Sequence, residues 1–134
     1  MTRNLKIEMA EMNKVPYLEL LGIRVVKLVK GSARLVVAVD DRMQSKFGVL
    51  HGGVLSSLAD AAVGIALFTM TQRGEKPVTV ELNINYLRPI KGKQIAAEAH
   101  IVHKGHTIAV GDVNVTDDDG LLIAKSRATY MVVS

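Results

Sequence analysis

Residues 51–70 read HGGVLSSLADAAVGIALFTM, in which two glycines precede a long apolar segment with a single charge, Asp60. This run predicts a helix, from residue 53 to about residue 71, that its own protein buries on most faces. A carboxylate inside such a helix is costly to bury unless it is paired or used. At Gly52 and Gly53 the backbone N–H groups at the start of the helix are unpaired and not covered by side chains, so they can bind a negatively charged group. One carboxylate and one donor site are a minimal set for acyl transfer or hydrolysis.

The polar residues of this predicted helix are spaced to share a face. Gly53, Ser57, Asp60 and Gly64 follow one another in steps of four, three and four residues, which places them along one side of a helix. One interpretation makes this small, polar side the floor of a groove, with Asp60 as its only ionisable group. The other is a close helix–helix contact in which Asp60 caps a neighbouring loop. Spacing alone does not choose between them.

Length and composition limit the classes of protein to consider. The 134 residues fit one domain, residues 1–134, with residues 1–16 as a loosely ordered or helical N-terminal extension. With 49% hydrophobic and 22% charged residues, the chain is globular. The absence of Cys excludes a disulfide scaffold, a Cys-based zinc site and a cysteine nucleophile. No apolar signal segment is found near the N-terminus, so we expect a cytoplasmic protein.

The net charge of +4 permits an anionic partner. Because the basic residues are scattered and only 4% of the residues are aromatic, a small polyanionic ligand such as a nucleotide-bearing cofactor fits better than nucleic acid. Asp60 and several small polar residues interrupt the apolar helix, so we expect no membrane span. His100 and His103 would point to opposite faces of a strand, and His106 lies beyond a glycine turn. We therefore expect no metal site.

The rest of the chain alternates between short strand-like runs and turns. Residues 16–21 predict a short helix. Residues 78–86 predict a half-buried strand, with the apolar side chains from Val78 to Tyr86 on one face and Thr79 on the other. The other predicted strands are residues 23–30, 32–39, 94–103, 107–116 and 121–133. Sequential hairpins indicate an antiparallel sheet. We predict an α+β fold in which a curved antiparallel sheet of five to six strands wraps one long central helix.

The helix geometry sets a further condition on any shared site. Asp60 lies seven residues after Gly53, or roughly 10 Å along a helix axis. A reacting carbonyl must lie within about 3 Å of both its donors and its attacking group. If both act in one site, the donors must come from a second subunit. We therefore expect a homodimer with composite sites at its interface.

Several of these residues together carry a family resemblance. Leu50-His51-Gly52-Gly53, Asp60 nine residues after the His, the strand VTVELNINY at 78–86 and Arg88-Pro89 resemble the hotdog-fold acyl-CoA thioesterases. The similarity is greatest to the phenylacetate-degradation type, which includes the human thioesterase superfamily proteins. It extends from about Tyr17 to the end of the chain. The family implies an acyl-CoA substrate, no separate cofactor, and a dimer of dimers whose arrangement the sequence does not determine.

The resemblance also implies roles for individual residues. Asp60 would be the nucleophile or general base, and the Gly52 N–H would polarise the thioester carbonyl. His51 would contact the carbonyl region of the substrate, or else the loop backbone. The family often has Asn or Gln six residues before this His. Here Ser45 occupies that position beside Gln44, and we favour Gln44 because its amide reaches farther. Thr79 would orient water. The expected substrate-binding residues are Ser45, Gly53, Ser57, Arg88, Lys104, Gly105 and His106.

Thioester hydrolysis of an aryl or medium-chain acyl-CoA is therefore the leading hypothesis. One alternative is a non-catalytic acyl-CoA-binding or regulatory module on the same fold. The other is a hydroxyacyl-thioester dehydratase, which needs a His base paired with an acid near the substrate β-carbon. The sequence does not indicate the acyl group or the pathway.

Overall fold

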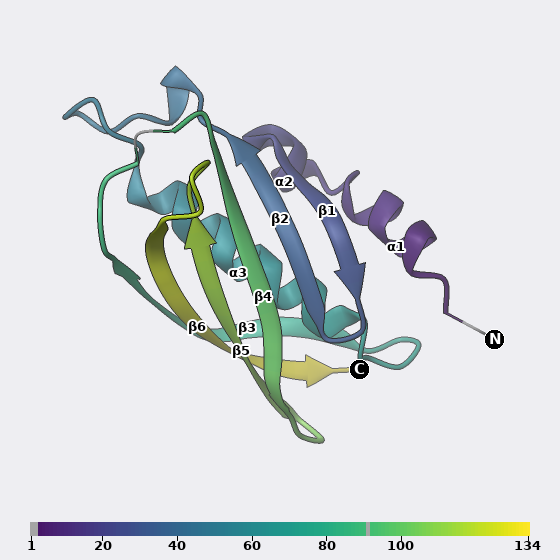
Figure 1. The fold of residues 1–134 in the computed structure, drawn as a ribbon. Helices are drawn as coiled ribbons and strands as arrows, with labels where there is room; N and C mark the ends of the chain where they lie inside the picture. Colours follow the sequence, from purple (N-terminus) through teal and green to yellow (C-terminus); the bar gives the residue numbers. More distant parts are fainter. Residues whose placement is uncertain (1–2, 91) are drawn as a thin grey trace.

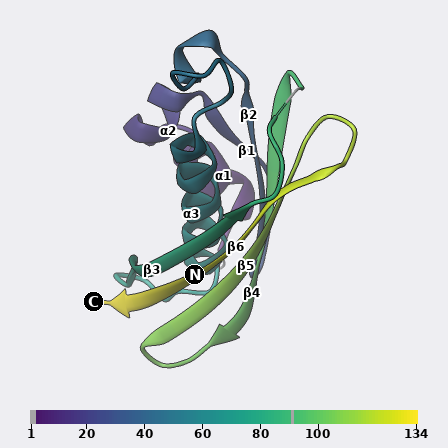
Figure 2. The same ribbon diagram turned by 90° about the vertical axis from the view of Figure 1, so that its left-hand side faces the viewer.

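A long apolar helix, α3 (Gly52–Phe68), lies in the concave side of a curved six-stranded sheet (Figures 1 and 2). The computed structural model describes residues 3–90 and 92–134. Every strand pair is antiparallel, in the order β1-β2-β4-β5-β6-β3. The strands are β1 (Ile23–Val29), β2 (Ser32–Ala38), β3 (Lys76–Tyr86), β4 (Gln94–Lys104), β5 (Ile108–Thr116) and β6 (Leu122–Val133). The predicted α+β architecture is confirmed.

The helix ends at Phe68, about three residues earlier than predicted, because two threonines satisfy its last carbonyl groups. The Thr69 hydroxyl donates to the Ala66 carbonyl and the Thr71 hydroxyl to the Phe68 carbonyl, each at 2.6 Å. Thr69 Oγ1 also accepts from the Gly31 N–H at 2.7 Å. Side chains that bond the terminal carbonyls compete with continuation of the helix. They also tie the helix end to the β1–β2 turn.

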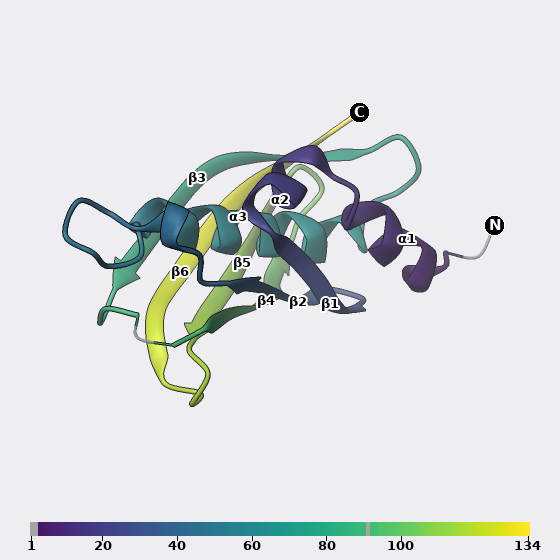
Figure 3. The ribbon, with the colours of Figure 1, turned by 90° about the horizontal axis from the view of Figure 1, so that it is seen from above.

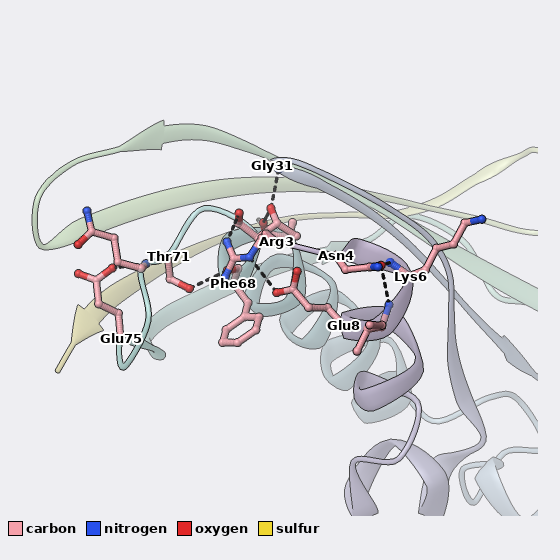
Figure 4. A network of polar contacts seen from close by, with 12 residues as sticks. Arg3, Asn4, Lys6, Glu8, Gly31, Phe68, Thr71 and Glu75 are labelled. Atoms are coloured by element: carbon pink, nitrogen blue, oxygen red, sulfur yellow. Dashed lines mark hydrogen bonds and ion pairs between the residues drawn. The ribbon is translucent and has the colours of Figure 1, made fainter. Parts of the chain in front are cut away.

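Two short helices, α1 (Leu5–Met12) and α2 (Pro16–Leu21), precede the sheet and pack against β1. Arg3, just before α1, connects the N-terminal segment to the end of α3 through polar contacts (Figure 4). Its guanidinium donates to the Thr69 carbonyl, lies 3.0 Å from a Glu8 oxygen and lies 5.5 Å from the centre of the Phe68 ring. A cation at a helix C-terminus is favourable because the last carbonyls carry partial negative charge.

The two edges of the sheet differ. Seen from above, α1 and α2 lie on the side of β1, while β3 runs along the opposite edge (Figure 3). Within the described residues, β3 pairs with β6 alone, which leaves its other side free. Val78 and Val80 on β3 are 49% and 55% exposed. β3 is therefore a long, partly apolar edge strand without a neighbour.

A bulge in β3 corrects the predicted alternation of that strand. Thr79 pairs with Tyr130 and Glu81 with Thr129, so Val80 is an extra residue without a partner. A bulge of this kind shifts the side-chain alternation by one residue. Thr79 consequently faces α3 together with Leu82, whereas the sequence pattern placed them on opposite faces.

Small residues allow the helix to lie close to the sheet. An added Cβ at Gly111 on β5 would lie 2.7 Å from Cγ1 of Val63 on α3. The strand residues packed against the helix include several buried alanines: Ala97, Ala99, Ala109 and Ala128. The bulky core side chains come largely from α3 and the β1–β2 hairpin. This close fit holds the polar side of α3 in a fixed position relative to β3 and β6.

Candidate active site

The entrance of α3 is built by His51, whose extended backbone precedes the first helical turn. Nδ1 of His51 accepts a hydrogen bond from the Gly53 N–H at 2.9 Å, so the neutral ring carries its proton on Nε2. This is an N-cap, in which a side-chain acceptor satisfies an N–H that the helix leaves unpaired. Of the two roles considered for His51, the structure shows the contact with its own loop backbone.

The Gly52 N–H is left free at this entrance. It donates to no acceptor within residues 3–90 and 92–134, whereas the Gly53 N–H is taken by His51. The Tyr86 ring covers Gly52, since an added Cβ there would lie 3.1 Å from two ring carbons. The Tyr86 hydroxyl lies 2.6 Å from Ser56 Oγ and donates to the Gly52 carbonyl at 3.1 Å. The structure thus singles out Gly52 as the glycine with an available donor.

Asp60 is half-buried two turns further along α3, and its two carboxylate oxygens have different surroundings. Oδ1 accepts from the Thr79 hydroxyl at 2.9 Å and from the Tyr130 hydroxyl at 2.6 Å. Oδ2 accepts no hydrogen bond from any described residue, and the protein does not bury it completely. The free oxygen is therefore accessible to a ligand or to water.

Tyr130 reaches Asp60 from the neighbouring strand β6 and is only 4% exposed. Its single hydroxyl hydrogen is shared between Oδ1 and the Asp60 main-chain carbonyl, which also lies 2.6 Å away. Burial, together with the hydrogen bond to Asp60, raises the pKa of the Tyr130 phenol well above its ordinary value. The phenol therefore stays protonated at neutral pH and remains a hydrogen-bond donor.

The side of α3 that carries Asp60 is less buried than the rest of the helix. Gly53 is exposed and Ser57, Asp60 and Gly64 are half-buried, whereas nine other helix residues, all apolar, are buried. The predicted small and polar face therefore exists. Ser57 Oγ lies 2.8 Å from the Tyr17 hydroxyl, so α2 covers part of this face.

Two hollows flank the helix entrance. One, of about 390 Å³, has Gly52 and Arg88 in its wall together with apolar residues such as Leu55 and Tyr86. The other, of about 330 Å³, lies on the α2 side of the helix. Its wall contains four residues singled out from the sequence: Gln44, His51, Gly53 and Ser57. The candidate site residues near the entrance thus fall into two groups on either side of α3.

Gln44 and Ser45 have different environments. Ser45 Oγ accepts from the Phe47 N–H at 3.2 Å, and the Ser45 carbonyl accepts from the Gly48 N–H at 3.1 Å. Both bonds belong to the tip of the loop before α3. Gln44 lies in the wall of the α2-side hollow with His51. The Gln44 side chain is therefore the one beside the helix entrance.

Three expected substrate-binding residues lie at the other end of the sheet. Lys104 ends β4, and Gly105 and His106 form the turn to β5, whereas Arg88 lies in the connection that leads to the start of β4. The length of β4 separates the two groups by roughly 33 Å. The Lys104 ammonium donates to the Gly105 carbonyl at 2.9 Å. Within one protomer, Arg88 and the β4–β5 turn are not brought together.

A second bulge corrects the prediction for the histidines. His100 pairs with Asp112 and His103 with Val110, which leaves Val102 unpaired. Asp112 and Val110 share a face of β5, so His100 and His103 also lie on one face, contrary to the prediction. In the described part of the chain, no three His, Asp or Glu side chains gather as at a metal site. No described helix is long and apolar enough to span a membrane.

Comparison with known proteins identifies the family. The Thioesterase superfamily pattern matches residues 47–124, more than half of the chain. The chain is 36% identical to acyl-coenzyme A thioesterase 13 of Mus musculus, over 96% of this chain and 94% of that protein. It is 30% identical to a medium/long-chain acyl-CoA thioesterase of Salmonella typhimurium, over 88% and 86% of the two chains. A crystal structure of a Haemophilus influenzae thioesterase superposes with a TM-score of 0.89 at 27% identity, covering 100% of this chain and 93% of that one.

The chain therefore belongs to the thioesterase superfamily and has its hotdog fold. It is a thioester hydrolase, as the resemblance implied.

Proposed function

We propose that this protein hydrolyses an aryl or medium-chain acyl-CoA to a free acid and CoA, with Asp60 as the reacting carboxylate. The observation that supports this most directly is the unpaired Oδ2 on the less buried side of a helix that carries no other charge. The names of the mouse and Salmonella relatives support an acyl-CoA substrate. Water is the only co-reactant, and the proposal includes no cofactor.

Asp60 and the Gly52 N–H can support hydrolysis by two routes, one with Asp60 as general base and one with Asp60 as nucleophile. As a general base, Asp60 Oδ2 takes a proton from water while the water oxygen adds to the thioester carbonyl carbon. The tetrahedral intermediate then collapses, the C–S bond breaks, and the proton passes to the thiolate of CoA. As a nucleophile, Oδ2 adds directly, CoA leaves as the thiolate, and water hydrolyses the resulting anhydride. In both routes the Gly52 N–H stabilises the negative carbonyl oxygen, a contribution often worth about 3 kcal/mol.

One protomer cannot bring these two groups to the same carbonyl. Gly52 and Asp60 are eight residues apart on α3, or roughly 12 Å along the helix axis. A carbonyl must lie within about 3 Å of both. We therefore propose a homodimer in which Asp60 faces the partner's Gly52.

The free edge of β3 is the proposed dimer contact. Edge strands with unpaired backbone groups readily pair with another chain, and Val78 and Val80 add apolar surface there. Substitution of Val80, at the bulge in β3, tests the proposed dimer contact, and a second bulge residue provides a matched control. Val80→Glu should give a monomer with little activity in light scattering and thiol-release assays. Val102→Glu alters a similarly exposed bulge valine in the interior of the sheet and should stay dimeric and active. A fully active monomer would exclude composite sites.

Arg88 and Gln44 are further proposed site residues, and they line separate hollows on either side of the α3 entrance. Arg88, in the wall of the hollow beside Gly52, is suited to a phosphate of CoA. Gln44 would hold the thioester or the attacking water, because Ser45 is engaged in its own turn. Lys104, Gly105 and His106 can serve the same CoA molecule only from the other protomer.

Asp60→Asn distinguishes hydrolysis from a binding module. The substitution removes the charge and the basic oxygen while keeping the size of the side chain. We expect the turnover of the responsive thioester to fall by about three orders of magnitude, with CoA binding by calorimetry retained. Asp119→Asn makes the same change in an exposed turn and should leave turnover unchanged. The substrates are benzoyl-, phenylacetyl-, hydroxyphenylacetyl- and straight-chain acyl-CoA.

Release of thiol from none of these esters by the wild-type protein would contradict hydrolysis. A dehydratase is less consistent with the geometry, because His51 Nδ1 is occupied by the Gly53 N–H. If Asp60→Asn retained wild-type turnover, Asp60 would not be the reacting carboxylate.

A further inference from the structure

Tyr130 contacts the proposed reacting group from a strand that carries none of the residues expected at the site. It lies 70 positions after Asp60, on β6, and its hydroxyl is 2.6 Å from both the main-chain oxygen and Oδ1 of Asp60. The ring is buried, so the hydroxyl position is fixed by packing. Thr79 also donates to Oδ1, but its side chain is on the exposed edge strand. Tyr130 is thus the more rigid of the two donors.

Space for the Tyr130 hydroxyl exists because residue 64 is a glycine. An added Cβ at Gly64 would lie 2.9 Å from the hydroxyl oxygen and 3.3 Å from two ring carbons. Gly64 lies one helical turn after Asp60, on the same side of α3. The glycine costs helix stability, and the phenol occupies the space that it leaves.

The two donors make the carboxylate oxygens of Asp60 inequivalent. Oδ1 is engaged twice, whereas Oδ2 has no partner among the described residues. A carboxylate without such anchors can rotate and present either oxygen at varying angles. Reactions of bound groups are sensitive to displacements of about 1 Å. A fixed Oδ1 therefore determines where Oδ2 points.

We propose that Tyr130 is a positioning residue that holds Asp60 by Oδ1 and so directs Oδ2 toward the thioester or the attacking water. This inference rests on the proposed function. Neither Thr79 nor Tyr130 is charged at neutral pH, and no charged side chain of the described residues hydrogen-bonds to the Asp60 carboxylate. The carboxylate is therefore held in place by neutral donors, of which Tyr130 is the buried one.

Tyr130→Phe removes the donor and little else. We expect kcat to fall tenfold or more while KM stays within about twofold. This split between kcat and KM is the signature of a misplaced reacting group, since substrate binding is retained. Ser126→Ala is the matched control. It removes another buried hydroxyl from β6, one that donates to the Asn83 carbonyl at 2.7 Å, and it should change neither kcat nor KM.

Gly64→Ala provides a second, independent perturbation, because its methyl group displaces the phenol. It should lower kcat strongly in the wild-type background and only slightly in the Tyr130→Phe background, since the clash involves mainly the hydroxyl. Additive effects of the two substitutions, or a Tyr130→Phe protein with wild-type kcat, would overturn the inference. If Asp60→Asn is inactive in the same assay, that result leaves the proposed function intact. Wild-type activity of Asp60→Asn would instead overturn both.

Discussion

The cap of α3 by His51 gives a quantitative prediction, because one substitution preserves the cap and another removes it. His51→Ala deletes the acceptor of the Gly53 N–H, a bond of 2.9 Å at an exposed position. Loss of an N-cap side chain costs typically about 1 kcal/mol. For a chain of 134 residues, this corresponds to a fall in Tm of about 3–4 °C. His51→Asn places an amide oxygen where it can accept the same hydrogen bond. It should lower the free energy of unfolding by only about a few tenths of a kcal/mol.

Urea unfolding followed by far-UV circular dichroism, at one protein concentration for all three proteins, measures these differences. Thiol release on the same samples then separates capping from contact with substrate. If His51 acts through the cap alone, His51→Asn keeps kcat/KM near that of the wild type. If the Nε2–H contacts the thioester carbonyl, both variants lose activity to a similar extent. Equal destabilisation of His51→Asn and His51→Ala would show that the His51 side chain does not cap α3.

Two further predictions concern stability. Gly111→Ala should lower the free energy of unfolding by about 1–3 kcal/mol, because its methyl group would lie 2.7 Å from Val63 Cγ1 in a closely packed core. Urea unfolding measures this difference. An unchanged unfolding midpoint would contradict the close approach of β5 to α3. The Arg42 side chain, hydrogen-bonded to Asp40, lowers the pKa of that carboxyl to about 2. The resulting stabilisation is complete above the unfolded pKa of about 4 and is lost as the pH falls toward 2. Asp40→Asn keeps an N-cap acceptor without the charge, so the difference in Tm between it and the wild type should shrink from pH 6 to pH 2.5 and at high salt. A difference independent of pH would show that the ion pair is not its source.

The sequence predicted the architecture well because the apolar periods are strong and the turns are marked. The α3 run, the hairpin between β1 and β2, and the later strands were placed within a few residues of their observed ends. The bulges at Val80 and Val102 were not predicted, nor were the register shifts at Val26 in β1 and between β5 and β6. Val80 and Val102 are ordinary strand residues, and no glycine or proline marks either position. Each of these two bulges reverses the side-chain alternation between the residues before it and those after it. Strict alternation therefore gave the wrong relative faces for Thr79 and Leu82 and for His100 and His103.

The candidate site was predictable where its residues are close in sequence. His51, Gly52 and Asp60 are all found at α3, as the motif indicated. Tyr130 was missed because it fits the apolar side of a strand and its contact with Asp60 spans 70 residues. One signal was available. A glycine inside a helix often marks a close approach of another group, and Gly64 is such a glycine. The sequence could indicate that something approaches there, but not which strand supplies it.

The fit between Gly64 and Tyr130 has a consequence for how this protein can vary. With 2.9 Å between a hypothetical methyl group and the phenol oxygen, a side chain at position 64 displaces the phenol unless position 130 holds a smaller residue. A lineage that gains a side chain at the first must already have, or soon acquire, a smaller residue at the second. Substitution of the pair would pass through intermediates in which Asp60 is held less well. The two positions are therefore expected to co-vary among related sequences.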